Sequence, residues 1–137
     1  MGRKASKEGT ALSEFQVGAQ VTAIYKTGKY IGEVTDIRPQ HYLVRVLAVE
    51  KHPMQGDLHN PKQADVMMFH ERRALAYREQ TNVPKQMVRT YEGSIPDYKT
   101  SLKQALDNMK SGLWEDDSDW AKRSLENAER LEADYFK

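Results

Sequence analysis

The sequence has no cysteine among its 137 residues, and this absence removes several kinds of chemistry. Disulfide bonds, thiolate zinc sites, a cysteine nucleophile and a cysteine-linked lipid anchor are all excluded. No apolar run approaches the roughly 20 residues that a membrane-spanning helix needs. The basic start of the chain is not followed by the apolar segment of a secretory signal peptide. We therefore expect a soluble protein located in the cytoplasm, without a membrane anchor.

Catalytic motifs are also missing. The sequence contains neither a glycine-rich phosphate loop nor a nucleophile elbow. Asp57 and Asp65 are candidate acid–base groups only because they lie in a long loop. The run of acids at residues 116–119 is better explained as the cap of a helix. We therefore expect no enzyme and no catalytic residue.

Imidazole and carboxylate groups gather in the middle of the chain, and both could bind zinc or iron. The groups concerned are His41, His52, His59, His70, Asp57, Asp65 and Glu71. Their spacing matches none of the standard pairs of metal ligands, such as two histidines four residues apart on a helix. We interpret them as loop and strand-end residues, and we expect neither a metal nor an organic cofactor.

Basic and acidic side chains nearly balance over the whole chain, but the two kinds are unevenly distributed along it. Lys and Arg number 21 against 20 Asp and Glu, a net charge of +1. Residues 1–91 carry 14 basic and 9 acidic side chains, whereas residues 92–137 carry 7 and 11. The change of sign suggests two structural segments. Residues 1–14 are small and polar without periodicity, so we expect a disordered tail before a domain at 15–91 and a second segment at 92–137.

Strand patterns fill the first segment. Alternating apolar and β-branched residues predict strands at 21–25, 30–37 and 41–49, joined by short turns at 26–29 and 38–40. Turns this short require antiparallel neighbours. Shorter strands are predicted at 66–69, 73–78 and 87–91, with a turn or a 3₁₀ turn at 82–84. Gly32, inside a strand, indicates a bulge or a sharp coil of the strand. The pattern is typical of an SH3-like antiparallel β-barrel.

Helical patterns fill the second segment. Ser94 and Asp97 have the spacing of a capping box, Pro96 suits a first helical turn, and Gly112 suits a stop. One apolar stripe runs between them, and a second stripe begins at Trp120, after the acidic run. The short connection predicts an antiparallel helical hairpin. Trp114 and Trp120 either pack this hairpin onto the barrel, which we favour, or leave one ring exposed as an anchor for a partner.

The long loop at residues 50–65 is the candidate partner-binding site, because loops of this length without periodicity often carry function. It presents apolar Met54 and Leu58 among turn residues. Methionine adapts readily to different contact surfaces. The predicted contact residues are Met54, Gln55, Asp57, Leu58, His59 and Asn60.

Nucleic-acid or ribosome binding is the main alternative, because SH3-like barrels often carry it. Basic and aromatic side chains alternate along the predicted strands and turns, as phosphate contacts and base stacking require. These side chains are Lys26, Lys29, Arg38, Arg45, Tyr25, Tyr30 and Tyr42. The positive excess of the first segment is small for a nucleic-acid-binding protein, so we favour protein binding.

Several runs of residues resemble the kinase-associated protein B family of endospore-forming bacteria. The runs lie at residues 25–34, 41–49, 51–61, 69–72, 78–85 and 96–102. The resemblance extends from about Phe15 to Lys137, and its most specific run is the loop sequence KHPMQGDLHNP at residues 51–61.

The resemblance implies an antiparallel sheet with an extended helical region. It also implies a role beside a sensor histidine kinase that feeds the sporulation phosphorelay, with that kinase or another phosphorelay protein as the partner. The family has been called a lipoprotein, and this sequence departs from that label because it has no cysteine. We therefore expect a cytoplasmic accessory protein that reaches the membrane periphery only through a kinase partner.

Overall fold

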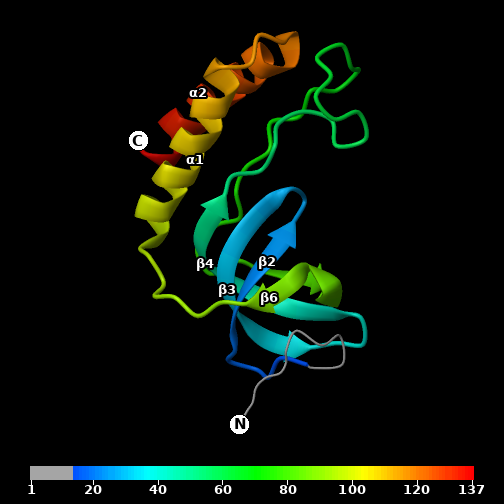
Figure 1. Ribbon diagram of the computed structural model, residues 1–137, viewed down its shortest axis with the longest axis vertical. Coiled ribbons are helices and arrows are strands. Elements are labelled where there is room, and N and C mark those ends of the chain that lie inside the picture. Colours follow the sequence, from blue (N-terminus) through cyan, green and yellow to red (C-terminus); the bar gives the residue numbers. More distant parts are fainter. Residues whose placement is uncertain (1–13) are drawn as a thin grey trace.

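The structure is a computed structural model that describes residues 14–137, so the predicted tail lies outside the described residues except for Glu14. Five strands form one antiparallel sheet: β2 (Gln20–Tyr25), β3 (Gly28–Ile37), β4 (His41–Lys51), β5 (Gln80–Pro84) and β6 (Val88–Thr90). One 3₁₀ helix and two α-helices complete the fold: η1 (Lys85–Met87), α1 (Tyr98–Trp114) and α2 (Asp119–Tyr135). The sheet lies at one end of the molecule, and the helices and a long loop lie at the other (Figure 1).

The sheet is open, so the prediction of a closed SH3-like barrel is not confirmed. The strand order is β5-β4-β3-β2-β6, with β5 and β6 at the two edges. Within the described residues no ladder joins these two edge strands, although η1 connects them directly. They have only five and three residues, and Pro84 at the end of β5 has no N–H to donate to a ladder. The predicted 3₁₀ turn exists, but it follows residues 82–84, which belong to β5.

Bulges curve the central strands, as Gly32 predicted. The pairing of β3 with β4 shifts register at three places, one of them between Ile31 and Gly32. A side-chain carbon at Gly32 would collide with the carbonyl oxygen of Arg45 on the neighbouring strand. Only glycine allows this approach of two backbones. The curved sheet encloses a small apolar core that includes Val21, Val44 and Val83.

The turn between β2 and β3 differs from the prediction of a four-residue turn that uses the freedom of Gly28. Lys26 and Thr27 alone form the turn, both with positive φ (48° and 69°). Gly28 already pairs with Tyr25 as the first residue of β3. Its lack of a side chain instead makes room for the Tyr30 ring, whose hydroxyl oxygen would lie 2.6 Å from a Cβ at position 28.

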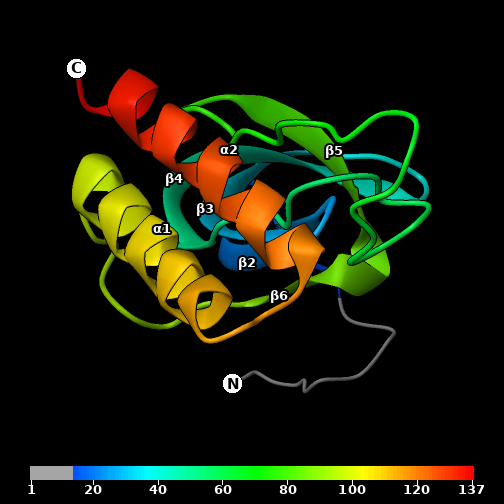
Figure 2. The ribbon, with the colours of Figure 1, turned by 90° about the horizontal axis from the view of Figure 1, so that it is seen from above.

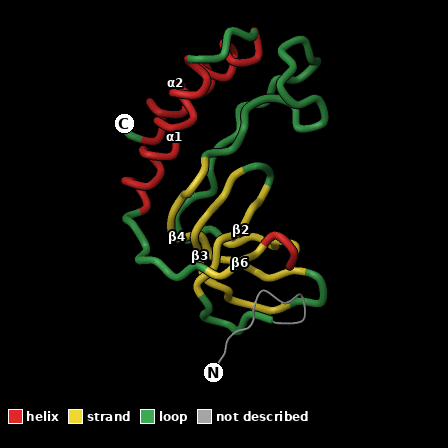
Figure 3. Tube along the Cα trace, in the orientation of Figure 1, coloured by secondary structure: helices red, strands yellow, loops and turns green. Residues whose placement is uncertain are grey.

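The predicted strands at 66–69 and 73–78 are absent, because this part of the chain belongs to a loop of residues 52–79. Its backbone groups find partners other than a β-ladder. The Arg72 N–H donates to the Gln55 side chain, and the Gly56 N–H donates to the His70 carbonyl. Figure 3 shows this loop as a long extension beyond the sheet, alongside the helices.

The helical hairpin is confirmed, with two corrections at its ends. Asp97, and not Ser94, is the N-cap of α1, where its carboxylate accepts from the Thr100 N–H. Gly112 does not stop α1, which continues to Trp114. The cap predicted in the acidic run is confirmed, because Ser118 accepts from the Ala121 N–H and Asp119 lies in the first turn of α2. An acid there is favoured by the partial positive charge of the helix N-terminus.

The helices pack on the sheet through a second apolar cluster and on the loop through a third. The second includes Tyr30 and Val46 from the sheet and Leu102 from α1. The third joins Leu113 and Trp120 to loop residues. Viewed from above, the two helices lie side by side across one end of the sheet (Figure 2).

Candidate functional site

The buried side-chain amide of Gln55 holds together the two segments of the long loop that lead away from the sheet and back to it. Gln55 is only 2% exposed, and its Nε2 donates to the carbonyl oxygens of Pro53 (3.0 Å) and Arg72 (2.9 Å). Its Oε1 accepts from the Arg72 N–H at 2.8 Å. The amide therefore replaces the backbone ladder that a pair of strands would supply. This predicted contact residue has a structural role and is not accessible to a partner.

His52 fixes the start of the loop against the end of α2. Its ring is 2% exposed, with Nδ1 3.0 Å from the Pro53 carbonyl oxygen and Nε2 2.9 Å from the Tyr135 hydroxyl. Because a carbonyl only accepts, Nδ1 carries the proton and Nε2 accepts from Tyr135. Burial lowers the pKa of His52, and its hydrogen bond to Pro53 opposes this only in part. The imidazole is therefore neutral, and the Tyr135 hydroxyl also accepts from the Ala74 N–H.

The first half of α2 holds the outer part of the loop. The Trp120 indole N–H donates to the Gln55 carbonyl oxygen at 3.1 Å, and the Lys62 ammonium lies 5.8 Å from the centre of the Trp120 ring. The Arg123 guanidinium lies 4.3 Å from the centre of the Phe69 ring and donates to the Ala64 carbonyl at 2.6 Å. Cations over aromatic faces and these hydrogen bonds give a loop without strands a defined shape.

The other predicted contact residues are accessible to different degrees. Met54 packs against the apolar cluster of α1 and α2, and Leu58 is half-buried. The Asp57 carboxylate accepts from the Asn60 side chain and the His59 N–H, which lower its pKa. His59 and Asn60 are exposed. The structure thus presents His59 and Asn60 on the surface and uses Asp57 to shape the turn that carries them.

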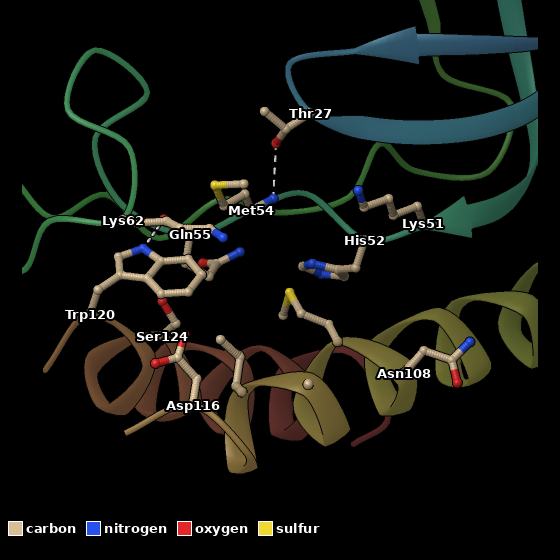
Figure 4. Close-up of a pocket in the computed structure, with 13 residues that line it drawn as sticks. Thr27, Lys51, His52, Met54, Gln55, Lys62, Asn108, Asp116, Trp120 and Ser124 are labelled. Atoms are coloured by element: carbon tan, nitrogen blue, oxygen red, sulfur yellow. Dashed lines mark hydrogen bonds between the residues drawn. The ribbon is translucent and has the colours of Figure 1, made fainter. Parts of the chain in front are cut away.

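A pocket of about 300 Å³ lies between this loop and the helical hairpin (Figure 4). Most of its wall is apolar, from Met54 on the loop, Met109 and Leu113 on α1, and Trp120 on α2. The remaining lining residues are Thr27, Lys51, His52, Gln55, Lys62, Asn108, Gly112, Asp116 and Ser124. Sequence reasoning missed this pocket, because its residues come from three distant parts of the chain.

Two residues of the pocket wall reduce the stability of the fold. Ser124 is fully buried, and among residues 14–137 its hydroxyl has no hydrogen-bond partner. Such an unsatisfied group costs about 1–3 kcal/mol. Gly112 lies inside α1, where glycine costs up to about 1 kcal/mol relative to alanine. A side-chain carbon at Gly112 would meet no atom within 4 Å, so packing does not require glycine there.

Large apolar side chains are exposed at the same end of the molecule. Met67 is 98% exposed and Met68 58% exposed, both in the outer loop, and Trp114 at the end of α1 is 69% exposed. We call these three residues, with His59 and Asn60, the loop end, because the outer loop and the last turn of α1 both lie at the end of the molecule away from the sheet (Figure 1). The expectation that both tryptophans pack inside holds for Trp120 but is wrong for Trp114. The apolar run at residues 66–69, whose pattern predicts a strand, is the sequence signal for this surface.

The described residues contain no group of three or more His, Asp or Glu side chains that could hold a metal ion. His52 is occupied by Pro53 and Tyr135, whereas His59 is exposed in the outer loop. In the same part of the chain, residues 14–137, no helix is long and apolar enough to cross a membrane.

These features define the fold as an open antiparallel sheet with a helical hairpin that packs against one long loop. The family model described as "Kinase associated protein B" matches residues 25–136. A relative from Bacillus subtilis (strain 168), named kinase-associated lipoprotein B, is 60% identical over 125 residues, which cover 91% of this chain and 98% of the relative. The chain therefore belongs to the kinase-associated protein B family, as its sequence patterns indicated.

A solved structure gives the same result. The crystal structure of kinase-associated protein B from Bacillus cereus is 57% identical to this chain and superposes with a TM-score of 0.79. The match covers 89% of this chain and 98% of the crystallised one. The open sheet with its helical hairpin is thus an architecture that this family shares.

Proposed function

We propose that this protein is a non-enzymatic accessory of a sensor histidine kinase and acts by contact with another protein. Membership of the family and the name of the Bacillus subtilis relative support the association with a kinase. The resemblance of the sequence to that family points to a kinase that feeds the sporulation phosphorelay. A cytoplasmic accessory of this kind needs a binding surface rather than a reacting group.

The loop end supports a role in protein contact, and the exposure of Met67 is the observation that carries the proposal. Trp114 is the last residue of α1, whose end lies beside the outer loop in Figure 1, and it adds a second large exposed apolar side chain. Exposed apolar groups gathered at one end are typical of interaction sites, and tryptophan is common among the residues that dominate binding energy. His59 and Asn60 supply polar contacts beside them.

The basic side chains proposed for nucleic-acid contact are largely paired with acids. Lys29 lies 3.3 Å from Glu50, Arg38 3.2 Å from Asp36 and Arg45 3.1 Å from Glu33. Tyr30 and Tyr42, two of the three candidate stacking rings, are buried in the core. Neither phosphate attraction nor stacking is therefore favoured on the sheet, and binding of RNA is kept as an outcome of the test below.

Site-specific photo-crosslinking tests the proposal. A photoreactive phenylalanine analogue replaces Met67 in the full chain, and the matched control carries it at Gln40, an exposed residue of the β3–β4 turn at the opposite end. In sporulating cells we expect a histidine kinase to be crosslinked from position 67 at least tenfold more than from position 40. Equal yields from both positions, or RNA as the crosslinked species, would contradict the proposal.

A second experiment tests whether the same surface is needed for signalling. Met67→Asp adds a charge to an apolar contact without changing the core, because the side chain is almost fully exposed. We expect the variant to unfold at the temperature of the wild type and to reduce signalling through the phosphorelay. His59→Ala and Asn60→Ala test the predicted loop contacts in the same way. Met54→Ala is unsuitable, since Met54 also packs in the apolar cluster.

A further inference from the structure

The pocket between the loop and the helices combines an apolar interior with a polar group that the protein leaves unused. The Ser124 hydroxyl, on the inner face of α2, can both donate and accept a hydrogen bond. It lies one helical turn from Trp120, so both residues project from the same face of α2. In the close-up, Ser124 points from α2 toward the Gln55 side chain (Figure 4).

The neighbouring polar groups do not satisfy this hydroxyl, because they already have partners. The Gln55 amide is used by the loop backbone, and both ring nitrogens of His52 are used by Pro53 and Tyr135. Ser124 is therefore the buried wall residue whose side chain lacks a hydrogen-bond partner, as far as the described residues show. Buried polar groups in proteins normally find a partner, which makes a bound molecule the natural candidate.

The charges that line the pocket favour an anion. Lys51 and Lys62 contribute two ammonium groups, and none of the ion pairs within residues 14–137 includes them. Asp116 contributes one carboxylate, which already accepts from the Ser118 N–H. Lys62 lies beside the Trp120 ring, so a cation and the Ser124 hydroxyl flank the same indole. His52 is neutral and adds no charge.

We propose that this pocket binds a small aromatic monocarboxylate with a hydrogen-bonding group at the far end of its ring. The ring packs among Met54, Met109, Leu113 and Trp120, and the carboxylate lies near Lys62. The Ser124 hydroxyl, which has no exposed surface in this structure, meets the ring substituent after its side chain rotates toward the pocket. The volume of about 300 Å³ is at the lower limit for small-molecule sites, which suits a single ring. Gly112 keeps one wall free of a side chain. This site goes beyond the proposed kinase contact, and its test needs no kinase.

The test is an NMR titration of the isotope-labelled full chain with 4-hydroxyphenylacetate. The two tryptophans give two indole N–H signals, which Trp114→Phe assigns. Trp120 lines the pocket and reports binding, whereas exposed Trp114 serves as an internal control. We expect a saturable shift of the Trp120 signal with a dissociation constant on the order of 1 mM, as is usual for so small a ligand. No saturable shift, or equal shifts of both signals, would overturn the proposal.

Two further probes define the chemistry of the ligand. Phenylacetate lacks the hydroxyl and should bind about fivefold more weakly, which corresponds to one ordinary hydrogen bond. Tyramine replaces the carboxylate by an ammonium group and should bind at least tenfold more weakly. Equal binding of phenylacetate would refute the role of Ser124, and stronger binding of tyramine would refute an anion site.

Three variants place the ligand within the pocket. Ser124→Ala should reduce the affinity for 4-hydroxyphenylacetate to that for phenylacetate, and should leave phenylacetate unchanged. Lys62→Gln should weaken both carboxylates severalfold, whereas Lys99→Gln, an exposed lysine outside the pocket, should weaken neither. Unchanged affinities in Ser124→Ala and Lys62→Gln would show that the probe binds elsewhere and would overturn the proposal.

Discussion

The sheet and the pocket wall use unusual residues for opposite reasons. In the sheet, each glycine in β3 is required by a neighbour, Gly28 by the Tyr30 ring and Gly32 by the Arg45 backbone. At the pocket, Gly112 is required by no contact, and Ser124 lacks a hydrogen bond within the described residues. Residues that are unfavourable for local structure or packing, and that gain no compensating contact, are expected at functional sites. The comparison therefore separates Gly28 and Gly32, which the fold requires, from Gly112 and Ser124, which the proposed ligand site explains.

The largest effect is expected where the loop depends on one side chain. Gln55→Leu removes four hydrogen bonds, one of them with Asn127, and leaves the half-buried Arg72 N–H without its partner. We expect a loss of about 3 kcal/mol in the free energy of unfolding, since each unsatisfied buried group costs about 1–3 kcal/mol. Chemical denaturation measures it, with Gln63→Leu as the control because Gln63 is exposed in the same loop. A similar small loss in both variants would mean that Gln55 does not hold the loop.

A matched pair of glycine substitutions compares the two regions directly. Gly32→Ala forces the β3 and β4 backbones apart, and we expect a loss of about 2 kcal/mol, typical of an overpacked site. Gly112→Ala introduces a better helix former into open space, and we expect a gain of up to about 1 kcal/mol. Thermal or chemical unfolding of both variants checks the signs. A loss in both would show that the pocket glycine, too, serves the fold.

The sequence predicted the three central strands well because their signals are local, but it did not predict the edge strand β5. Strand alternation, the bulge at Gly32 and the acidic cap of α2 each depend on neighbouring residues or on one close approach. It did not predict the open edges, because closure depends on how two short strands meet. The sequence also did not predict how the loop folds. Gln55 and Arg72 are 17 residues apart, and the Gln55 side chain bonds to the Arg72 N–H and carbonyl as a neighbouring strand would.

The candidate site was predictable only in part. The prediction of a loop at 50–65 is correct for residues 52–65, which contribute to both the pocket and the loop end, whereas residues 50 and 51 belong to β4 and the loop continues to residue 79. No sequence feature around Gln55 distinguishes a buried residue that holds the loop together from an exposed residue that contacts a partner. Ser124 stands on the apolar side of α2 in the sequence, but only the structure shows that its hydroxyl lacks a partner.

The stability of the loop should depend on pH through His52. Its pKa is lowered in the folded protein, so below about 6.5, the ordinary value for histidine, the unfolded chain binds a proton more readily. Its contribution to stability is complete above pH 6.5 and decreases as the pH falls toward the folded pKa. Denaturation at pH 7.5 and 5.5 measures this change, above the range where the carboxylates titrate. We expect His52→Asn to flatten the dependence and His41→Asn to preserve it.

The smallest effect concerns the hydroxyl of Ser124. Ser124→Ala removes a buried group that has no partner within residues 14–137, and we expect the free energy of unfolding to rise by about 1 kcal/mol. Ser101→Ala is the contrasting control, because the Ser101 hydroxyl accepts from the Val49 N–H and donates to the Tyr98 carbonyl. That variant should lose stability by a similar amount. Equal changes in the two serine variants would contradict the assignment of Ser124 to the pocket.

The most direct test of the account joins stability and binding in one protein, the double variant Gly112→Ala/Ser124→Ala. If these residues are kept for a ligand at the expense of stability, the variant should unfold about 5 °C above the wild type. It should also bind 4-hydroxyphenylacetate no better than phenylacetate, as judged from the Trp120 indole signal. A lower unfolding temperature, or an undiminished preference for 4-hydroxyphenylacetate, would contradict the account.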